Sequence, residues 1–326
     1  ITGSPTLSAD GTVRSLEGID MNIVPAWKKY GAKSGKRQVI VALIDTGVDI
    51  THPELSGSIW TNTGEIPGDG IDNDGNGYVD DVNGWNFVSN SNEICTGEED
   101  SHGTHGAGTI AAAWNNGGIA GITDSTHVKL MVLKALGGSE GKGSPESVIE
   151  AIKYAEANGA DICNLSFGSS NCTPEFEAAI RDSKMLFVVA AGNGNQYQIG
   201  YDIDKSPVYP ASLPYDNVIT VGNLLFNGHL DESSNYGATS VDLAAPGTYI
   251  LSTIPGDSYA YMSGTSMAAP MVTGAAALIY SARTDLSLQD IKTAILSTVH
   301  KLAPLKGKTA TGGMLDVSAA IKWTKN

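Results

Sequence analysis

Positive charge is scarce in this chain of 326 residues, which has 20 lysine and arginine residues against 35 aspartate and glutamate residues. The formal net charge is −15 at pH 7. Because nucleic acids and anionic membranes attract basic surfaces, this balance argues against both as partners. It suits a soluble protein and one that binds cations.

Long apolar runs are also absent. No stretch of about 18 apolar residues occurs, so we expect no membrane span. The start, ITGSPTLSADGTV, has no basic segment, no apolar segment and no Met, and is typical of a processed or trimmed end. Cysteine is rare, and Cys95, Cys163 and Cys172 have no metal-binding spacing. One disulfide, between Cys95 and Cys172, and three free thiols both remain open.

What the chain does have is an alternation of short β-branched runs with helical patterns. Such runs are typical of strands buried on both faces of a sheet, and the alternation predicts a mostly parallel sheet with helices on both faces. Helix starts are indicated at Ser144-Pro145-Glu146 and at Ser287, with Asp290 three residues on. We expect an α/β fold in a single domain over residues 1–326. The predicted strands are 39–44, 128–134, 161–166, 185–191 and 218–222.

Polar or small residues follow three of these runs. Asp45 follows the first run, Ser166-Phe167-Gly168 follows another, and Gly192-Asn193 follows a third. In open α/β sheets, sites form beyond the carboxyl ends of the strands. The sequence therefore predicts an active-site rim at this edge.

Each candidate residue has a competing interpretation. Asp45 lies in an Asp-Thr-Gly motif that aspartic proteases also carry, but their chemistry needs a second such motif, which is absent. His102 and His105 are three residues apart, whereas the zinc motif H-E-x-x-H spaces them by four and supplies a glutamate. We expect His102 to be a base and His105 to lie in the core. Ser266, taken alone, is an ordinary helix N-cap serine.

Taken together, four segments resemble the subtilisin family of serine proteases, the subtilases. They occur in the order Asp, His, Ser that is known for subtilisin. The resemblance implies a three-layer subtilisin-like fold, with Ser266 as nucleophile, His102 as the base and Asp45 orienting it. It also implies that Asn193 donates to the oxyanion. The segments are LIDTGVD (43–49), SHGTHGAGT (101–109), VAAGNGN (189–195) and MSGTSMAAPMVTGAAAL (262–278).

The resemblance further implies where a polypeptide substrate binds as an extended strand. One wall of the primary pocket is Ser166, Phe167 and Gly168, and the other is Ala190, Ala191 and Gly192. The segment Gly141-Lys142-Gly143 pairs with the substrate backbone. Val208 stands at the pocket floor, where many relatives have glycine, which favours small or medium P1 side chains. Acidic residues near the cleft would instead favour basic P1, as in kexin-like relatives.

Residues 70–81, GIDNDGNGYVDD, open like an EF-hand calcium loop. Position 12 is Asn83 rather than a bidentate glutamate, and the flanks are rich in Gly, Pro and Asn, so we expect a calcium loop that is not an EF-hand. The resemblance implies a calcium-pinned insertion between the Asp and His motifs. A second, shorter calcium loop is implied at 114–122, near Glu54. The expected ligands of the first loop are Asp72, Asp74, Asn76, the Tyr78 carbonyl and one or both of Asp80 and Asp81.

The sequence thus predicts a serine endopeptidase with structural calcium, mature, secreted and monomeric, whose own prodomain has been cleaved. Two other classes remain open. One is a catalytically silent subtilase that acts as a binding or regulatory protein, against which the intact Asp45, His102, Ser266 and Asn193 argue. The other is a calcium-dependent interaction module.

Overall fold

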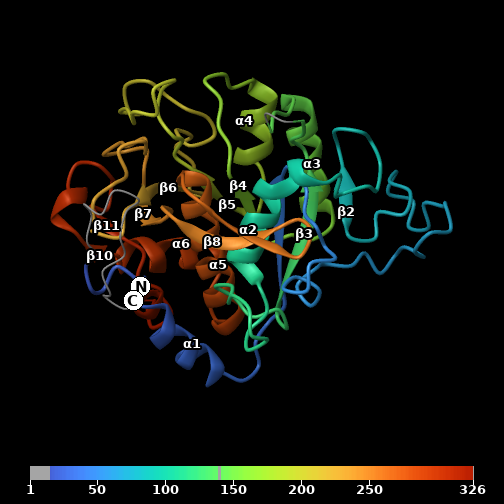
Figure 1. The fold of residues 1–326 in the computed structure, drawn as a ribbon, viewed down its shortest axis with the longest axis horizontal. Helices are drawn as coiled ribbons and strands as arrows, with labels where there is room; N and C mark the ends of the chain where they lie inside the picture. The colour runs from blue at the N-terminus through green and yellow to red at the C-terminus, as the bar shows by residue number, and fades with distance from the viewer. Residues whose placement is uncertain (1–14, 139–140, 326) are drawn as a thin grey trace.

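The framework of the protein is one long sheet (Figure 1). The computed structural model describes residues 15–138 and 141–325, and within them nine strands are ordered β10-β11-β7-β6-β5-β4-β1-β3-β2. Neighbouring strands are parallel, except that β10 and β11 are antiparallel. The predicted α/β class with a mostly parallel sheet is confirmed. The strands are β1 Val39–Asp45, β2 Gly84–Asn86, β3 Val128–Lys134, β4 Ile162–Leu165, β5 Leu186–Ala190, β6 Val218–Leu224, β7 Leu243–Pro246, β10 His300–Lys301 and β11 Gly313–Met314.

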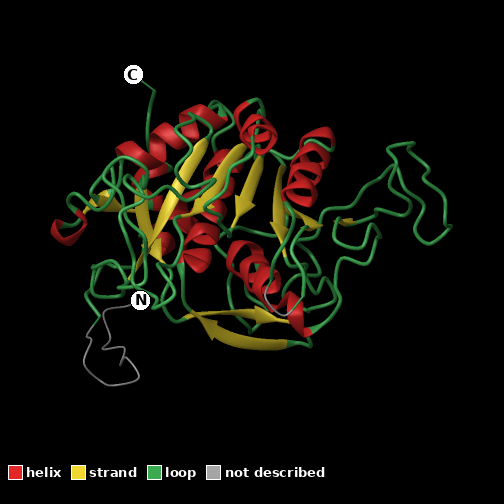
Figure 2. Cartoon of the chain, turned by 90° about the horizontal axis from the view of Figure 1, so that it is seen from above, coloured by secondary structure: helices red, strands yellow, loops and turns green. Residues whose placement is uncertain are grey.

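Helices cover both faces of this sheet (Figure 2). The face that carries Val41 and Leu43 packs against α1, α2, α5, α6 and α7, whereas the face that carries Ala42 and Ile44 packs against α3 and α4. Because side chains alternate along a strand, Asp45 lies on the same face as Leu43, toward α2 and α5. The helices are α1 Ile23–Gly31, α2 Ser101–Ala111, α3 Pro145–Ala157, α4 Pro174–Arg181, α5 Thr265–Ala282, α6 Leu288–Ser297 and α7 Val317–Ala320, with short 3₁₀ helices η1 Glu98–Asp100 and η2 Ala303–Leu305.

Local sequence signals explain the helix starts. The Ser144 hydroxyl accepts a hydrogen bond from the Ser147 N–H at 3.1 Å, with Pro145 in the first turn of α3. Ser287 and Asp290 form a reciprocal capping box at α6. Both helix starts predicted from the sequence are confirmed.

Two segments lie outside the sheet. Strands β8 Ile250–Ile254 and β9 Ser258–Met262 form an antiparallel hairpin beside α2. The segment between β1 and β2 projects away from the sheet at one end of the molecule (Figure 1).

Within the described residues, no helix is both long enough and apolar enough to cross a membrane. Cys95, Cys163 and Cys172 are all free thiols, so the disulfide considered for Cys95 and Cys172 is not formed.

Candidate active site

The carboxyl end of β1 brings an aspartate to the start of a helix. Asp45 is the last residue of β1, and His102 is the second residue of α2. The Oδ1 atom of Asp45 lies 2.7 Å from Nδ1 of His102. The Thr46 N–H donates to the same carboxylate oxygen at 2.7 Å. The backbone N–H of the next residue therefore holds the Asp45 carboxylate, which faces the imidazole of His102.

The electrostatics of this pair favour a charged imidazole. The negative charge of Asp45 raises the pKa of His102 above its usual value, and burial opposes this effect. The Asp45 side chain is 2% exposed, whereas that of His102 is 33% exposed. The histidine thus has its Nδ1 engaged by a buried carboxylate while part of its ring remains accessible.

A close helix approach sets this contact. A Cβ on Gly103 would lie 2.2 Å from the carbonyl oxygen of Gly47, so only glycine lets α2 come this near to the turn after β1. The Gly103 N–H also donates to the Thr46 hydroxyl at 3.1 Å. Gly103 therefore allows the close backbone packing that brings His102 to Asp45.

Ser266 lies in the first turn of α5. The helix runs from Thr265 to Ala282 and is buried along most of its length, with small residues packed against β4, β5 and β6. The Ser266 hydroxyl donates to the carbonyl oxygen of Ser166 at 2.9 Å. The Ser166 hydroxyl in turn donates to the Ser266 carbonyl at 3.2 Å. The serine is thus tied to the residue that follows β4.

Asn193 is held by the residue before Ser266. Its Oδ1 accepts from the Thr265 N–H at 2.8 Å and from the Thr265 hydroxyl at 2.9 Å. Gly192 donates its N–H to the same hydroxyl at 3.1 Å. Thr265 thus engages the carbonyl oxygen of the Asn193 amide, and the amide nitrogen forms no hydrogen bond with a described residue. The sequence did not single out Thr265, although it directly precedes the serine.

A cavity of about 320 Å³ opens beside Ser266 and Asn193. Both predicted walls reach it, with the exception of Ala191, which is fully buried and whose carbonyl accepts from Asn235. Six lining residues were missed. Ser169, Ser170, Gly194 and Thr265 are sequence neighbours of predicted residues, whereas Tyr201 and Asn235 come from loops that no local pattern marks. The cavity is lined by Ser166, Phe167, Gly168, Ser169, Ser170, Ala190, Gly192, Asn193, Gly194, Tyr201, Val208, Asn235, Thr265 and Ser266.

A second cavity, of about 410 Å³, shares Phe167, Gly168 and Ser169 with the first. Gly141 and Gly143 line it, as expected of residues beside a bound substrate strand. Its apolar surface comes largely from residues that the sequence did not single out, namely Leu136, Val148, Phe176 and Tyr209. The peptide bond between Tyr209 and Pro210 is cis.

His105 lies in the core, away from any group of metal ligands. It is fully buried, its Nε2 lies 2.9 Å from the Ile250 carbonyl oxygen, and burial lowers its pKa. Within the described residues, one group of three or more His, Cys, Asp or Glu side chains could hold a metal ion. It consists of Glu65, Asp74 and Asp81.

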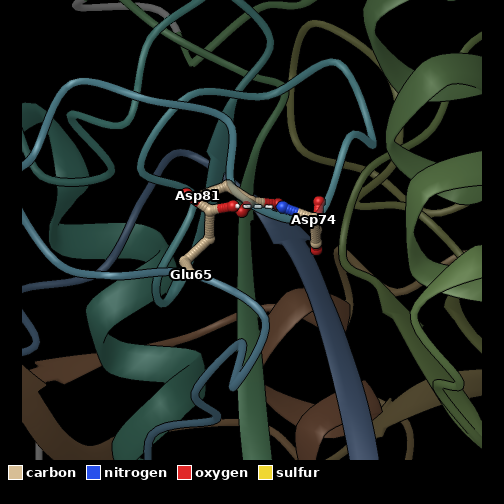
Figure 3. A group of neighbouring side chains, drawn as sticks. All are labelled: Glu65, Asp74 and Asp81. Atoms are coloured by element: carbon tan, nitrogen blue, oxygen red, sulfur yellow. Dashed lines mark hydrogen bonds between the residues drawn. The ribbon is translucent and has the colours of Figure 1, made fainter.

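The ligand atoms of Glu65, Asp74 and Asp81 lie within 4.8 Å of one another (Figure 3). Asp81 is fully buried. The Asn62 amide donates to Asp74 at 2.9 Å and to Asp81 at 2.8 Å. The Asn76 amide also donates to both carboxylates. Sequence reasoning missed Glu65, an acid that precedes the loop.

The other expected calcium ligands have different partners in the structure. Asp72 accepts from the backbone N–H groups of Gly75, Asn76 and Gly77. Asp80 accepts from the N–H groups of Gly68 and Gly70. The Tyr78 ring packs edge-on against Trp85, Phe87 and Tyr154. From the expected set, the structure therefore brings together Asp74, Asn76 and Asp81.

The second loop, residues 114–122, is organised by Glu54. Its carboxylate accepts from the Asn116 amide at 2.9 Å, the Ile119 N–H at 3.2 Å and the Tyr259 hydroxyl at 2.8 Å. This carboxylate is thus held by N–H donors of the loop and by a hydroxyl group of β9, and a calcium ion at this loop stays a prediction.

Comparison with known proteins places the chain in a family. A profile of the subtilase family matches residues 36–315. The chain is 38% identical over 268 residues to the major intracellular serine protease of Bacillus subtilis (strain 168), covering 81% of this chain and 75% of that protein. It is 37% identical over 266 residues to the intracellular serine protease of Paenibacillus polymyxa, covering 80% and 72%. The chain therefore belongs to the subtilase family, and the expected serine endopeptidase class is confirmed at that level.

A further relative is longer than this chain. Subtilisin-like protease 1 of Plasmodium berghei (strain Anka) is 35% identical over 299 residues, which cover 86% of this chain. The chain spans about half of that relative, 49% of its length.

The expectation of a secreted protein is wrong. The bacterial relatives from Bacillus subtilis and Paenibacillus polymyxa are both named as intracellular serine proteases, which points away from secretion. The resemblance to subtilases alone did not fix a compartment, because the family includes proteins named as intracellular.

Proposed function

We propose that this chain hydrolyses peptide bonds as a serine endopeptidase with Asp45, His102 and Ser266 as its catalytic triad. The observation that carries the proposal is the 2.7 Å contact between Asp45 and His102 at the strand edge. The position of Ser266 supports it further, since that residue lies in the first turn of α5 and lines the cleft.

In this mechanism the Ser266 Oγ attacks the substrate carbonyl carbon while Nε2 of His102 takes its proton. Asp45, on Nδ1, orients the ring and stabilises the imidazolium. His102 then gives the proton to the leaving amine, which departs and leaves an acyl-enzyme. Water hydrolyses the ester by the same proton route, which restores the Ser266 hydroxyl and releases the acid product.

The negative charge that develops on the substrate oxygen needs donors. The amide nitrogen of Asn193 and the backbone N–H of Ser266, at the positive end of the α5 dipole, supply them. The fixation of Asn193 by Thr265 supports this role, because donors that are already oriented cost no reorganisation during the reaction.

The substrate class that fits the cleft is an extended polypeptide beside Gly141 and Gly143. Val208 supports a preference for small or medium P1 side chains. Its Cγ1 lies 2.8 Å from where a Cβ on Gly168 would stand and 3.8 Å from where one on Gly192 would stand. Among the described residues that line the cavity there is no aspartate or glutamate, so the cavity offers no carboxylate to pair with a basic P1 side chain.

A fluorophosphonate tests the nucleophile. The protein is incubated with the probe and its intact mass and modified peptide are measured. We expect one adduct, on Ser266, which disappears in Ser266→Ala and in His102→Ala. The matched control Ser263→Ala removes a neighbouring serine, whose hydroxyl accepts from the Tyr249 N–H, and should leave the adduct. A folded protein without any adduct would favour the silent subtilase.

We further propose that the segment 62–84 binds one structural calcium ion, with Glu65, Asp74 and Asp81 among its ligands. Like charges this close repel one another, and no lysine or arginine within the described residues forms an ion pair with them. A hard divalent cation with oxygen ligands would offset that repulsion. Asp72, Asn76, Tyr78 and Asp80 stay predictions as direct ligands.

Thermal unfolding with and without calcium tests this site. We expect calcium to raise the melting temperature of the wild type and to have little effect on Glu65→Gln. The exposed Glu93→Gln is the matched control and should respond like the wild type. An equal response in all three proteins would refute the site. That the working protein is monomeric and that a prodomain precedes it stay predictions.

A further inference from the structure

A buried ion pair lies behind the Asp45–His102 contact. Lys134, the last residue of β3, has its Nζ 2.5 Å from Oδ1 of Asp100, and the two side chains are 2% and 0% exposed. The same Nζ donates to the Thr46 carbonyl, and Glu99 Oε1 lies 3.3 Å away. An ammonium group has three donors, and these three acceptors satisfy them.

The two principal partners of Lys134 are adjacent to the two elements that carry Asp45 and His102. Thr46 directly follows Asp45, donates its N–H to the Asp45 carboxylate and accepts from Gly103 in α2. Asp100 ends η1, two residues before His102. Strand register puts Lys134 itself opposite Asp45. Lys134 therefore bridges the turn after β1 and the approach to α2 at a single point.

The other oxygen of Asp100 extends the connection. Its Oδ2 accepts from the N–H groups of Thr96 and Gly97, the latter at 3.1 Å, and so holds the loop before η1. A Cβ on Gly47 would lie 2.7 Å from Asp100 Oδ1, which shows how closely the turn after β1 packs on this carboxylate.

Stability alone is a weak reason for this arrangement. Burying a lysine and an aspartate removes both from water, and a well-packed apolar pair of similar volume is often as stable or more so. What an apolar pair cannot do is fix a carbonyl and a carboxylate at a set separation, because it makes no directional contacts.

We propose that Lys134 is a positioning residue for the Asp45–His102 pair. Its ammonium holds the Thr46 carbonyl and the Asp100 carboxylate together, which fixes the carboxyl end of β1 relative to the first turn of α2. The inference rests on the proposed function, since the pair it positions is the proposed catalytic one. The titratable groups that face this region are Asp45, Asp49, Cys95, Glu99, Asp100 and His102.

The test compares Lys134→Met with the double variant Lys134→Met, Asp100→Asn. The double variant leaves no unpaired buried charge, and the amide oxygen of the new asparagine can still accept from the loop, so it folds even where the single variant does not. The matched control is Lys129→Met on the same strand, whose Nζ donates only to carbonyl groups remote from the triad, those of Gly57 and Ser125. The readouts are kcat, KM, the pH dependence of kcat/KM and the melting temperature.

We expect kcat of the double variant to fall by about 10²-fold, the loss that a displacement of about 1 Å can cause, with KM unchanged. The acidic limb of kcat/KM should move to lower pH, because a looser Asp45 raises the pKa of His102 less. Lys129→Met should match the wild type in both. A folded double variant with wild-type kcat and pH profile would overturn the positioning role. A wild type that hydrolyses no peptide and takes no fluorophosphonate would overturn the proposed function itself.

Discussion

Replacing Val208 by glycine is expected to open the cavity beside Ser266 to large P1 side chains. Val208 is 7% exposed, and its Cγ1 lies between Gly168 and Gly192, which belong to the two predicted walls of the primary pocket. Glycine removes three carbon atoms from that space. The backbone contacts of residue 208, an N–H donated to Ser212 Oγ and a carbonyl that accepts from the Ser212 N–H, do not need the side chain.

The magnitude follows from the apolar groups that a substrate can then bury. Three methylene-sized groups at about 0.8 kcal/mol each give about 2.4 kcal/mol, which is roughly 60-fold in a ratio of kcat/KM values. We therefore expect the preference for P1 Phe over P1 Ala to rise by about that factor in Val208→Gly. Val208→Ala, which removes two carbon atoms, should give roughly 15-fold.

The assay is a set of peptides that differ only at P1, with kcat/KM measured for each variant. Val128→Ala is the control, because Val128 is also buried but lies at the opposite end of β3 from the cleft. It should lose stability without changing the ratio. An unchanged ratio in Val208→Gly, or a wild type that already prefers Phe or Tyr over Ala and Leu, would refute Val208 as the floor of the pocket.

Three further predictions concern pH, calcium and local stability. Asp45 raises the pKa of His102 and only the neutral imidazole accepts a proton, so kcat/KM of the wild type should rise with pH through that raised pKa. Asp45→Asn should move this acidic limb to lower pH and lower kcat by about 10⁴-fold. An acidic limb that does not move in Asp45→Asn would contradict the assignment of Asp45. In denaturant titrations, chelation of calcium should lower the free energy of unfolding by about 2.7 kcal/mol relative to protein in free calcium at 100 times the calcium Kd. Glu65→Gln should abolish this difference. Ser287→Ala should cost about 1 kcal/mol in the same titrations with activity intact, because it removes only the α6 cap, and a loss of activity at full stability would speak against this.

The strands and caps were predictable because their signals are local. The run 128–134 matches β3 residue for residue, and Ser144 and Ser287 cap helices at the expected positions. Strand order was not predictable in this way. It depends on which apolar faces pack together, and those partners are far apart in the sequence, as with β1, which lies between β3 and β4.

The sequence by itself determined the family and the α/β class and supplied the candidate residues of the site, because motif spacing and β-branched runs are local properties of the chain. Tertiary structure alone decided which groups meet. It brought Asp45 into contact with His102. It also placed the buried Lys134 between Asp100 and the carbonyl group of Thr46. It brought Glu65, rather than Asp72 or Asp80, into the cluster with Asp74 and Asp81. It also placed Tyr201 and Asn235 at the cavity beside Ser266. These contacts depend on how loops fold back over the sheet edge, which no short stretch of sequence specifies.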